Sequence, residues 1–326
     1  MLRKTRLFVV ACLCAGLWSS AALAKELKVP FRYSTIEAAV KATRNGDTIL
    51  VAPGTYKVGK MNLNKKITLA SDYIKSKNEK DIKETIIDGS SAGKAWLRIT
   101  AKDSKVIGLT ILGGKKHSIS IECPYAEVLH CRIIKGKDQL SFEGGGGRVA
   151  YCYFDQAGDD SVDADDSVDY IVEYCIFDNV KQDANETRLQ PKSGNLTTHI
   201  FRYNTILRAG ESGIQLIDYK GDCKRQFQIY GNVFINCKGA GVSITDGTTN
   251  ENYKGSEMVE NVAVYNNTFY NCNYGMTMGP NVTVVNNIFT GCSKGIGKSH
   301  YVSGGGKSMI DYCLFYKNET DYDSGL

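Results

Sequence analysis

An unusually acidic segment lies in the middle of the chain. Residues 158–166 read Gly-Asp-Asp-Ser-Val-Asp-Ala-Asp-Asp, which is five aspartates in nine residues. If Val162 and Ala164 face the interior from a strand, Asp163 and Asp165 face outward together, because side chains alternate between the two faces of a strand. Adjacent carboxylates repel one another, and a cation, a basic residue or simple solvation must offset the repulsion. The segment therefore predicts either a cation site or a solvated acidic face.

The chain around this segment repeats a short pattern. Eight reference positions, all Cys or Asn, recur at intervals of 20 to 35 residues, each with an apolar residue three positions earlier and another two positions later. The reference positions are Cys131, Cys152, Cys175, Asn204, Asn232, Asn267, Asn287 and Cys313. Since only 42% of the residues are apolar, this regularity predicts coils that bury one face against the next. Asn tolerates a left-handed turn, and a stack of identical polar residues can bond along the coil axis, so we expect the recurring Asn at bends.

The start of the mature chain carries a helix signal followed by a strand. Ser34-Thr35-Ile36-Glu37 is a capping box, and Asn45-Gly46 is a stop signal, so residues 34–45 are predicted to form one helix. A strand is predicted at residues 47–52, before the turn Pro53-Gly54-Thr55-Tyr56.

This opening resembles that of right-handed parallel β-helix proteins of the pectate-lyase-like superfamily, in which the helix plugs the first coil. The resemblance and the repeats together predict an all-β fold. We expect a single-stranded right-handed parallel β-helix with a short N-terminal capping α-helix. It would fill residues 25–326 as one domain, with about 9–10 coils from residue 47 onward.

In each coil another strand follows the reference position and its apolar partner. Aligning these strands from coil to coil produces two columns of outward-facing residues. The first contains Ser120, Ser141, Asp163, Glu186, Gln215, Ser243 and Thr277, and the second contains Glu122, Glu143, Asp165, Arg188, Ile217 and Thr245. Strands about 4.8 Å apart would bring the acids of the middle coils together. We predict Asp160, Asp163, Asp165 and Glu186 as metal ligands. An all-oxygen set favours Ca²⁺ over Zn²⁺.

Three long inserts follow these columns, at residues 189–198, 218–226 and 246–260. They are predicted to leave the same corner and to wall a groove, with Lys192 and Lys220 at nearly equivalent places. A groove that holds a cation, Arg188 and two lysines suits an extended anionic polymer. We predict an acidic polysaccharide as the partner, with Glu143, Gln215 and Asp218 in contact with it.

Local segments resemble several families, and no single family is matched throughout. Residues 159–163 are similar to the calcium segment of one pectate lyase family, and Asp163 and Asp165 followed by Glu186 resemble the calcium acids of the larger one. Lys192-Ser193 followed by Asn204-Thr205 resembles the segments around the catalytic lysine of alginate lyases and chondroitinase B. The arginine that those lyases place one coil later is absent here, because Ile217 and Asp218 occupy that place.

The chemistry that these residues favour is β-elimination on a uronate. A cation on the substrate carboxylate stabilises the enolate-like charge that forms when C5 loses its proton. Lys192, with its pKa lowered by Arg188 and the metal, is the predicted base, Arg188 the carboxylate clamp, and Lys220 the competing base.

Two other classes of function remain open. Gly158-Asp159-Asp160 resembles one fragment of the polygalacturonases, which are glycoside hydrolases with paired carboxylates. Their Gly-His-Gly and Arg-Ile-Lys segments are absent from this sequence. The third class is a non-catalytic, glycan-binding or cell-surface β-helix whose acids hold a structural ion. In that class Lys192 is an ordinary loop lysine, and Arg188 pairs with Asp165.

The N-terminus predicts export. A basic start, an apolar run and the small residues Ala22-Leu23-Ala24 form a signal peptide at residues 1–24, so the product would be secreted, periplasmic or on the cell surface. A lipoprotein signal ending at Cys12 is the alternative. The remaining chain has 37 basic and 35 acidic residues, which gives no basic footprint for nucleic acid. No later stretch is apolar enough for a transmembrane segment, and we expect a monomer.

Overall fold

The structure is a computed structural model that describes residues 24–164, 169–189, 197–218, 225–246, 261–279, 281–298, 307–324 and 326. For residues 188–189, 218 and 245–246 it describes the backbone alone. The signal peptide predicted at residues 1–24 lies almost entirely outside the described residues.

Three long sheets, here called A, B and C, run the length of the molecule, and all of their pairings are parallel. Sheet A contains, in order, β1 (Glu26–Val29), β2 (Thr48–Val51), β5 (Thr68–Ser71), β8 (Lys105–Ile107), β11 (Ala126–Leu129), β14 (Gly147–Ala150), β17 (Tyr170–Glu173), β20 (Thr197–Arg202), β23 (Arg225–Tyr230), β26 (Asn261–Tyr265), β29 (Val282–Val285) and β32 (Met309–Asp311). Sheet B contains β3 (Gly54–Lys57), β6 (Thr85–Asp88), β9 (Thr110–Leu112), β12 (Arg132–Ile134), β15 (Tyr153–Asp155), β18 (Ile176–Asp178), β21 (Thr205–Ile206), β24 (Val233–Ile235), β27 (Thr268–Tyr270), β30 (Ile288–Thr290) and β33 (Leu314–Tyr316). Sheet C contains β4 (Met61–Leu63), β7 (Ala95–Ile99), β10 (His117–Ile121), β13 (Asp138–Phe142), β16 (Val162–Asp163), β19 (Asn185–Leu189), β22 (Ile214–Asp218), β25 (Ala240–Asp246), β28 (Tyr274–Met278), β31 (Lys294–Lys298) and β34 (Thr320–Tyr322).

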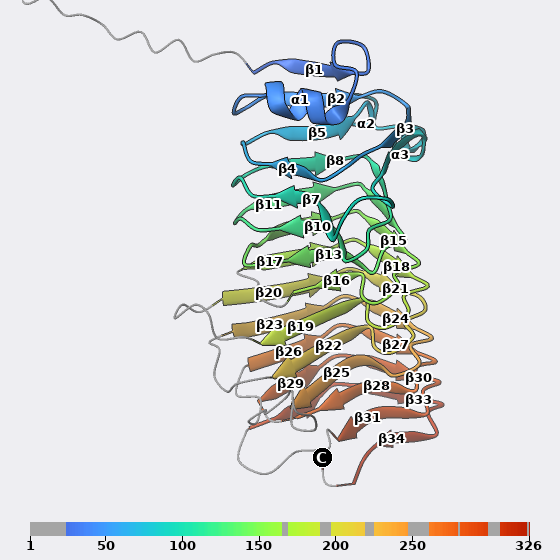
Figure 1. Cartoon of the computed structure of the whole chain (residues 1–326). Coiled ribbons are helices and arrows are strands. Elements are labelled where there is room, and N and C mark those ends of the chain that lie inside the picture. The colour runs from blue at the N-terminus through green and yellow to red at the C-terminus, as the bar shows by residue number, and fades with distance from the viewer. Residues whose placement is uncertain are drawn as a thin grey trace, which may run out of the picture.

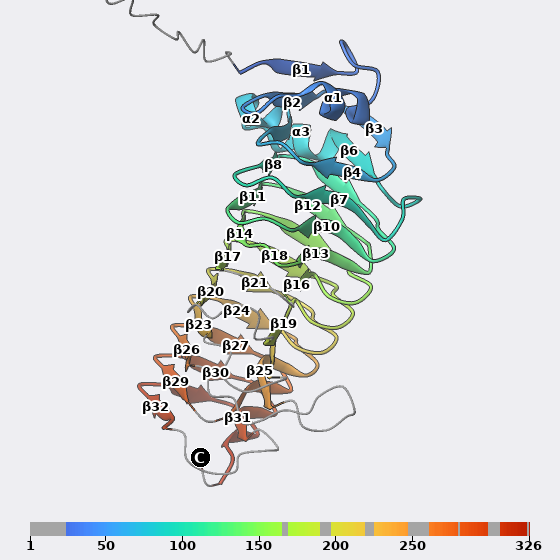
Figure 2. The same ribbon diagram turned by 60° about the vertical axis from the view of Figure 1, so that its left-hand side comes forward.

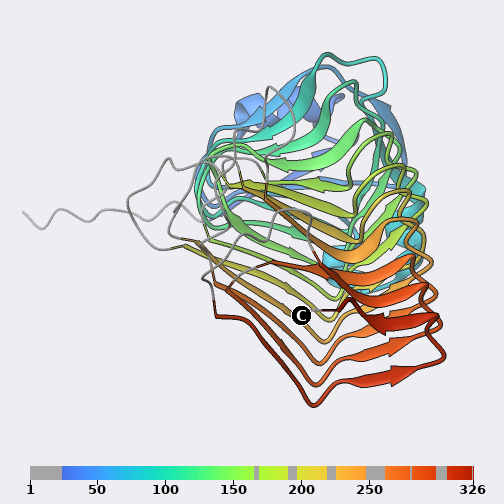
Figure 3. The same cartoon turned by 90° about the horizontal axis from the view of Figure 1, so that it is seen from below.

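The chain visits the three sheets in turn, and each circuit forms one coil of a right-handed parallel β-helix, as predicted. Figures 1 and 2 show the strands stacked as successive rungs, and Figure 3 shows the coils superimposed when the molecule is seen from below. Within the described residues sheet B has 11 strands, slightly more than the predicted 9–10 coils. The additional coils lie upstream of Cys131, where the repeat pattern starts.

Three short helices cover the N-terminal coils. Helix α1 (Ile36–Ala42) lies beside β1 and β2 (Figure 1), with Thr35 as its N-cap accepting a hydrogen bond from the Ala38 amide at 3.1 Å. The helix ends before the predicted Asn45-Gly46, because Thr43 is already extended. Helices α2 (Tyr73–Ser76) and α3 (Glu79–Glu84) lie between β5 and β6 and are not indicated by the repeat pattern.

The apolar columns of the sequence repeat are the core of the fold. In sheet A, Val128, Val149, Val172, Phe201, Ile229, Val264, Val284 and Ile310 are consecutive register partners. In sheet B, Ile133, Phe154, Phe177, Ile206, Phe234, Phe269, Phe289 and Phe315 are consecutive partners as well. Both predicted columns are therefore confirmed.

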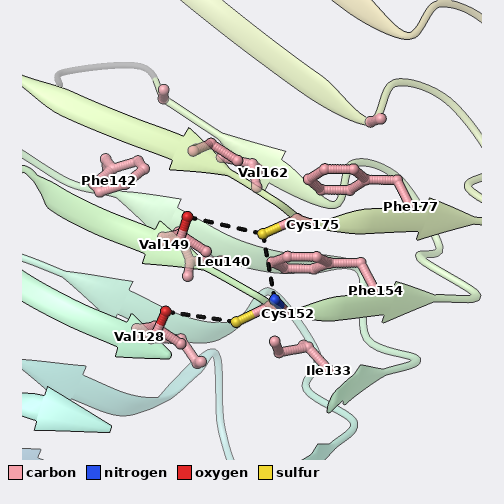
Figure 4. Packing of buried hydrophobic residues seen from close by; sticks show 14 of the residues in the cluster. Val128, Ile133, Leu140, Phe142, Val149, Cys152, Phe154, Val162, Cys175 and Phe177 are labelled. Carbon is pink, nitrogen blue, oxygen red and sulfur yellow. Dashed lines mark hydrogen bonds between the residues drawn. The ribbon is translucent and has the colours of Figure 1, made fainter. Parts of the chain in front are cut away.

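The reference positions form an internal polar ladder between sheets A and B. The Cys152 thiol donates to the Val128 carbonyl at 3.5 Å, and the Cys152 amide donates to the Cys175 sulfur at 3.4 Å (Figure 4). One coil later Asn takes over, since the Asn204 side-chain oxygen accepts from the Cys175 amide at 2.9 Å. All eight cysteines in the described part of the chain are free thiols.

Of the two reasons predicted for the recurring Asn, the polar stack along the coil axis is confirmed and the left-handed turn is wrong. The left-handed residue of each bend is the one before the reference position, for example Tyr151 (φ 57°) or Tyr174 (φ 53°). The reference Asn forms the ladder with the preceding coil: the Asn232 side-chain oxygen accepts the Asn204 backbone amide at 2.9 Å, and the Asn204 side-chain nitrogen donates to the Val172 carbonyl at 2.9 Å.

A second ladder pairs phenylalanine with glycine in the C-terminal half. The rings of Phe234, Phe269 and Phe289 stack at 4.9 and 4.8 Å between centroids, within 6° of parallel. A Cβ atom on Gly241 would lie 2.4 Å from the Phe269 ring, and one on Gly275 would lie 2.4 Å from the Phe289 ring. Each of these rings therefore lies where the preceding coil has no side chain.

Candidate functional site

The acidic residues gather on the outer face of sheet C. Ser120, Ser141, Asp163, Glu186, Gln215 and Ser243 are consecutive register partners, as the alignment predicts. Val162 and Ala164 are fully buried on the inner side. Asp163 and Glu186 point outward, yet they are only 8% and 6% exposed. The middle of the column is therefore a covered acidic site and not a solvated face.

Three carboxylates converge at this point. Asp160, Asp183 and Glu186 each offer an oxygen that lies within 4.8 Å of the other two, and all three residues are buried. We call these residues the carboxylate cluster. Asp183 lies in the bend before β19, and its carbonyl accepts the Ser161 amide at 3.1 Å, which stacks it directly on Asp160.

Burial and mutual repulsion decide the protonation of this cluster. Burial is the main reason that the pKa of Asp160 rises to about 10, and the charges of Glu186 and Asp183 add to it. Burial likewise raises the pKa of Asp183 to about 8, despite the Ser212 amide that donates to it at 2.6 Å. The second oxygen of Asp183 is buried and has no hydrogen-bond partner. Three buried carboxylates with an unsatisfied oxygen fit a hard divalent cation such as Ca²⁺.

A neighbouring acidic group is different, because a lysine lies within it. Asp138, Asp159 and Asp160 also offer oxygens within 4.8 Å of one another. The Lys137 ammonium lies 2.5 Å from Asp159 and 3.6 Å from Asp138. This cation offsets the repulsion, so the group does not require a metal ion.

A buried histidine, which the sequence reasoning missed, lies one coil before this group. His117 is 2% exposed; its Nδ1 lies 3.3 Å from Asp138 and its Nε2 lies 2.9 Å from Glu143. Burial lowers the pKa of His117, but the two carboxylates outweigh it and raise that pKa to about 9. His117 in turn is the main reason that the pKa of Glu143 falls to about 2. At neutral pH His117 is therefore a cation that lies against the ionised carboxylate of Glu143.

The predicted metal ligands are distributed over two groups. Asp160 and Glu186 meet in the carboxylate cluster together with Asp183, which was not predicted. Asp163, the register partner of Glu186, lies within 4.8 Å of His117 and Glu143. Asp165 lies outside the described residues.

Of the three predicted catalytic residues, the structure describes only Arg188, and of that residue only the backbone. Arg188 is in β19 and pairs in register with Ile217, while Asp218 ends β22 between Leu189 and Asp246. The three inserts therefore leave sheet C at the ends of adjacent strands, and the predicted common corner is confirmed. Lys192 and Lys220 lie on the inserts, outside the described residues. Gln215 follows Glu186 in the outward column.

The comparisons with known proteins establish the fold. No family model matches the sequence, and no curated protein is similar to it in sequence. The catalytic domain of a GH87 α-1,3-glucanase in complex with nigerose is 12% identical, with a TM-score of 0.51 over 93% of this chain and 66% of that chain. A family 28 exopolygalacturonase of Yersinia enterocolitica is 9% identical, with a TM-score of 0.50 over 92% of this chain and 77% of the other. A PL6 polysaccharide lyase of Pseudopedobacter saltans is 13% identical, with a TM-score of 0.44 over 91% of this chain and 93% of the lyase chain.

This chain has the parallel β-helix fold of the glucanase and the exopolygalacturonase. At these identities the similarity concerns the fold alone, and the chain spans just under two thirds of the glucanase chain. Among the described residues no helix has the length and apolarity needed to cross a lipid bilayer.

Calcium should stabilise the protein, and it should do so more strongly as the pH rises. In the metal-free chain the pKa values of Asp160 and Asp183 lie above the ordinary carboxyl value of 3.8, so folding stability falls as the pH rises through about 8 and about 10. A cation competes with those protons, and its binding to the folded state raises the melting temperature. Differential scanning calorimetry with and without Ca²⁺ between pH 6 and pH 9 measures the shift. Asp183→Asn should abolish most of it, whereas the exposed Glu319→Gln should not.

His117→Gln should destabilise the fold in a pH-dependent manner. Because the folded-state pKa of about 9 exceeds the ordinary value of 6.5, the stabilisation is complete below pH 6.5 and is lost as the pH rises to 9. The difference in free energy of unfolding between wild type and variant should be about 3 kcal/mol at pH 6 and should shrink towards pH 9. Urea denaturation at a series of pH values tests this. A difference that stays constant across that range would mean that His117 serves only as a packing residue.

Proposed function

We propose that this chain is an exported polysaccharide lyase that cleaves an acidic, uronate-containing glycan by β-elimination with Ca²⁺ held at the carboxylate cluster. The observation that supports this is the convergence of Asp160, Asp183 and Glu186 within 4.8 Å in a buried position on the long outer face of a β-helix. Export follows the signal peptide predicted at residues 1–24. The pectate-lyase-like fold is compatible with a polysaccharide substrate.

The remaining roles fall to residues along the same face. A bound Ca²⁺ supplies electrostatic stabilisation for the charge that develops on the uronate carboxylate. Lys192 accepts the C5 proton as the base, with Lys220 as the competing candidate, and Arg188 binds the substrate carboxylate through its planar guanidinium. Glu143, Gln215 and Asp218 contact the sugar residues on either side.

A hydrolase of the polygalacturonase type is the second candidate, and missing sequence segments disfavour it. The Gly-His-Gly and Arg-Ile-Lys segments of that family are absent from this sequence. Glycosidases use a pair of carboxyl groups that flank the scissile bond. The carboxylate cluster instead brings three buried carboxylates together, each with an oxygen within 4.8 Å of the other two, which suits joint coordination of one cation.

The test is a panel of polymers that separates the reaction classes. Pectate, alginate and glycosaminoglycans are incubated with the protein and Ca²⁺, and both ultraviolet absorbance and new reducing ends are recorded. A lyase produces an unsaturated uronate, so the two signals rise together. Reducing ends without absorbance would identify a hydrolase, and binding without either signal would identify a non-catalytic glycan-binding protein.

A further inference from the structure

A cavity of about 340 Å³ lies on the outer face of sheet C, on the N-terminal side of the carboxylate cluster. Its lining residues are Ala95, Lys116, His117, Ser120, Glu122 and Glu143. Small-molecule sites start at about 300 Å³, so the cavity is large enough for one sugar-sized group. It lies on the same face as the proposed catalytic groove, so a polymer bound along sheet C would cross it.

The cavity contains a motif that is repeated on two adjacent coils. Ser120-Ile-Glu122 and Ser141-Phe-Glu143 are aligned, because Ser120 and Ser141 are register partners. In each case the serine hydroxyl donates to the glutamate two residues later, at 2.8 Å to Glu122 and at 3.1 Å to Glu143. The two carboxylates are therefore held side by side on successive rungs.

Each carboxylate is also paired with a cation. The Arg98 guanidinium donates to both oxygens of Glu122, with its Nε at 2.6 Å. The His117 Nε2 lies 2.9 Å from Glu143, and the Lys116 ammonium lies 3.8 Å from it. The side chains of Glu122 and Glu143 keep 22% and 34% of their surface exposed. They are thus fixed, ionised acceptors that still face the cavity.

We propose that Glu122 and Glu143 form a subsite for an uncharged, hydroxyl-bearing sugar residue. Sugar hydroxyls donate hydrogen bonds, and a hydrogen bond to an ionised carboxylate is stronger than one between neutral groups. The charged side chains that line the cavity are two cations, Lys116 and His117, and two anions, Glu122 and Glu143, and both cations are paired with Glu143. The lining therefore has no net positive charge that would favour a uronate carboxylate over an uncharged sugar.

This subsite narrows the class of substrate, and in that respect it rests on the proposed function. The coils rise by about 4.8 Å, which is close to the length of one sugar residue. Glu143 belongs to the coil directly before the one that carries Asp160. A neutral sugar at the subsite and a uronate at the carboxylate cluster therefore describe a polymer in which the two kinds of residue alternate or lie within a few residues of each other.

Binding measurements on two kinds of polymer test the subsite. Hyaluronan and unsulfated chondroitin, in which uronates alternate with uncharged sugars, are compared with polygalacturonate and alginate, which consist of uronates alone. Affinity electrophoresis in gels that contain each polymer gives dissociation constants without any need for turnover. We expect Glu122→Gln and Glu143→Gln to weaken binding of an alternating polymer by about 5–30-fold while binding of the uniform uronates changes by less than twofold. Glu127→Gln is the matched control, since Glu127 pairs with Lys105 on sheet A.

The outcomes separate this inference from the proposed function. If the glutamate variants fold normally, as judged by melting temperature, and bind alternating polymers as wild type does, the subsite is overturned even where unsaturated products appear. It is overturned too if wild type binds uniform uronates alone, or none of the polymers. If binding of an alternating polymer depends on both glutamates but no unsaturated product forms, the subsite is supported and the lyase assignment fails.

Discussion

Lys192→Ala should lower the rate of uronate elimination by about 10²–10⁴-fold, which is the usual contribution of a positioned acid or base. The lysine belongs to the first of the three inserts that leave sheet C at a common corner. Its removal should leave the melting temperature and the calcium response unchanged, because the core and the carboxylate cluster are built from other residues. The initial rate of absorbance increase on the polymer that gives the highest wild-type rate is the measurement.

Two further lysine variants show whether the effect is specific. Lys220→Ala tests the competing base on the next insert. Lys238→Ala is the matched control, since Lys238 is exposed at the corner between β24 and β25. Near-normal turnover of Lys192→Ala together with a loss in Lys220→Ala would transfer the role of base to Lys220. If both variants retain full activity, the lyase assignment itself is wrong.

Phe269→Ala should cost about 3–5 kcal/mol of folding stability, as is usual when a fully buried aromatic side chain is truncated. Phe269 has no exposed surface, and its ring stacks between those of Phe234 and Phe289. The variant loses both stacking contacts in addition to the buried area. Chemical denaturation followed by circular dichroism gives the change in free energy of unfolding.

Tyr270→Ala is the control for this measurement. Tyr270 is the next residue in β27, but it is 51% exposed on the outer side of sheet B. Its truncation should cost well below 1 kcal/mol, as most surface substitutions do. Equal losses in the two variants would mean that the aromatic stack does not determine stability.

The sequence is sufficient to predict the coils because their core positions obey one strict rule. The apolar residues three before and two after each reference position are inward-facing on two sheets, and a change to a polar residue there would bury an unsatisfied group. The register of Val149, Val172 and Phe201 therefore follows from the spacing of the repeat alone. The N-terminal coils escape this rule, since α2 and α3 interrupt them and their bends lack the Cys or Asn ladder.

The candidate site was only partly predictable, because its residues come from bends as well as strands. Glu186 was predicted because it lies within a strand, where side chains alternate between the two faces of the sheet. Asp183 lies just before a strand of sheet C, and His117 is the first residue of another. At these places the alternation of side chains along a strand does not predict where a side chain points. The numbering did contain a signal: Asp160 to Asp183 spans 23 residues, the same interval as Cys152 to Cys175. Aligning each acidic residue with the residue one coil later, with the length of that particular coil as the offset, would have identified the cluster.

The pairing of phenylalanine with glycine in the C-terminal half limits how this chain can change during evolution. A larger residue at Gly241 or Gly275 meets a phenylalanine ring of the next coil, so the two positions cannot vary independently. A duplication or deletion that begins at one such glycine and ends just before the next, such as residues 241–274, transfers a complete set of contacts. An event whose length is not a whole coil would place a side chain against a ring. Whole coils, counted from glycine to glycine, are therefore the units by which the C-terminal half of this β-helix can lengthen or shorten.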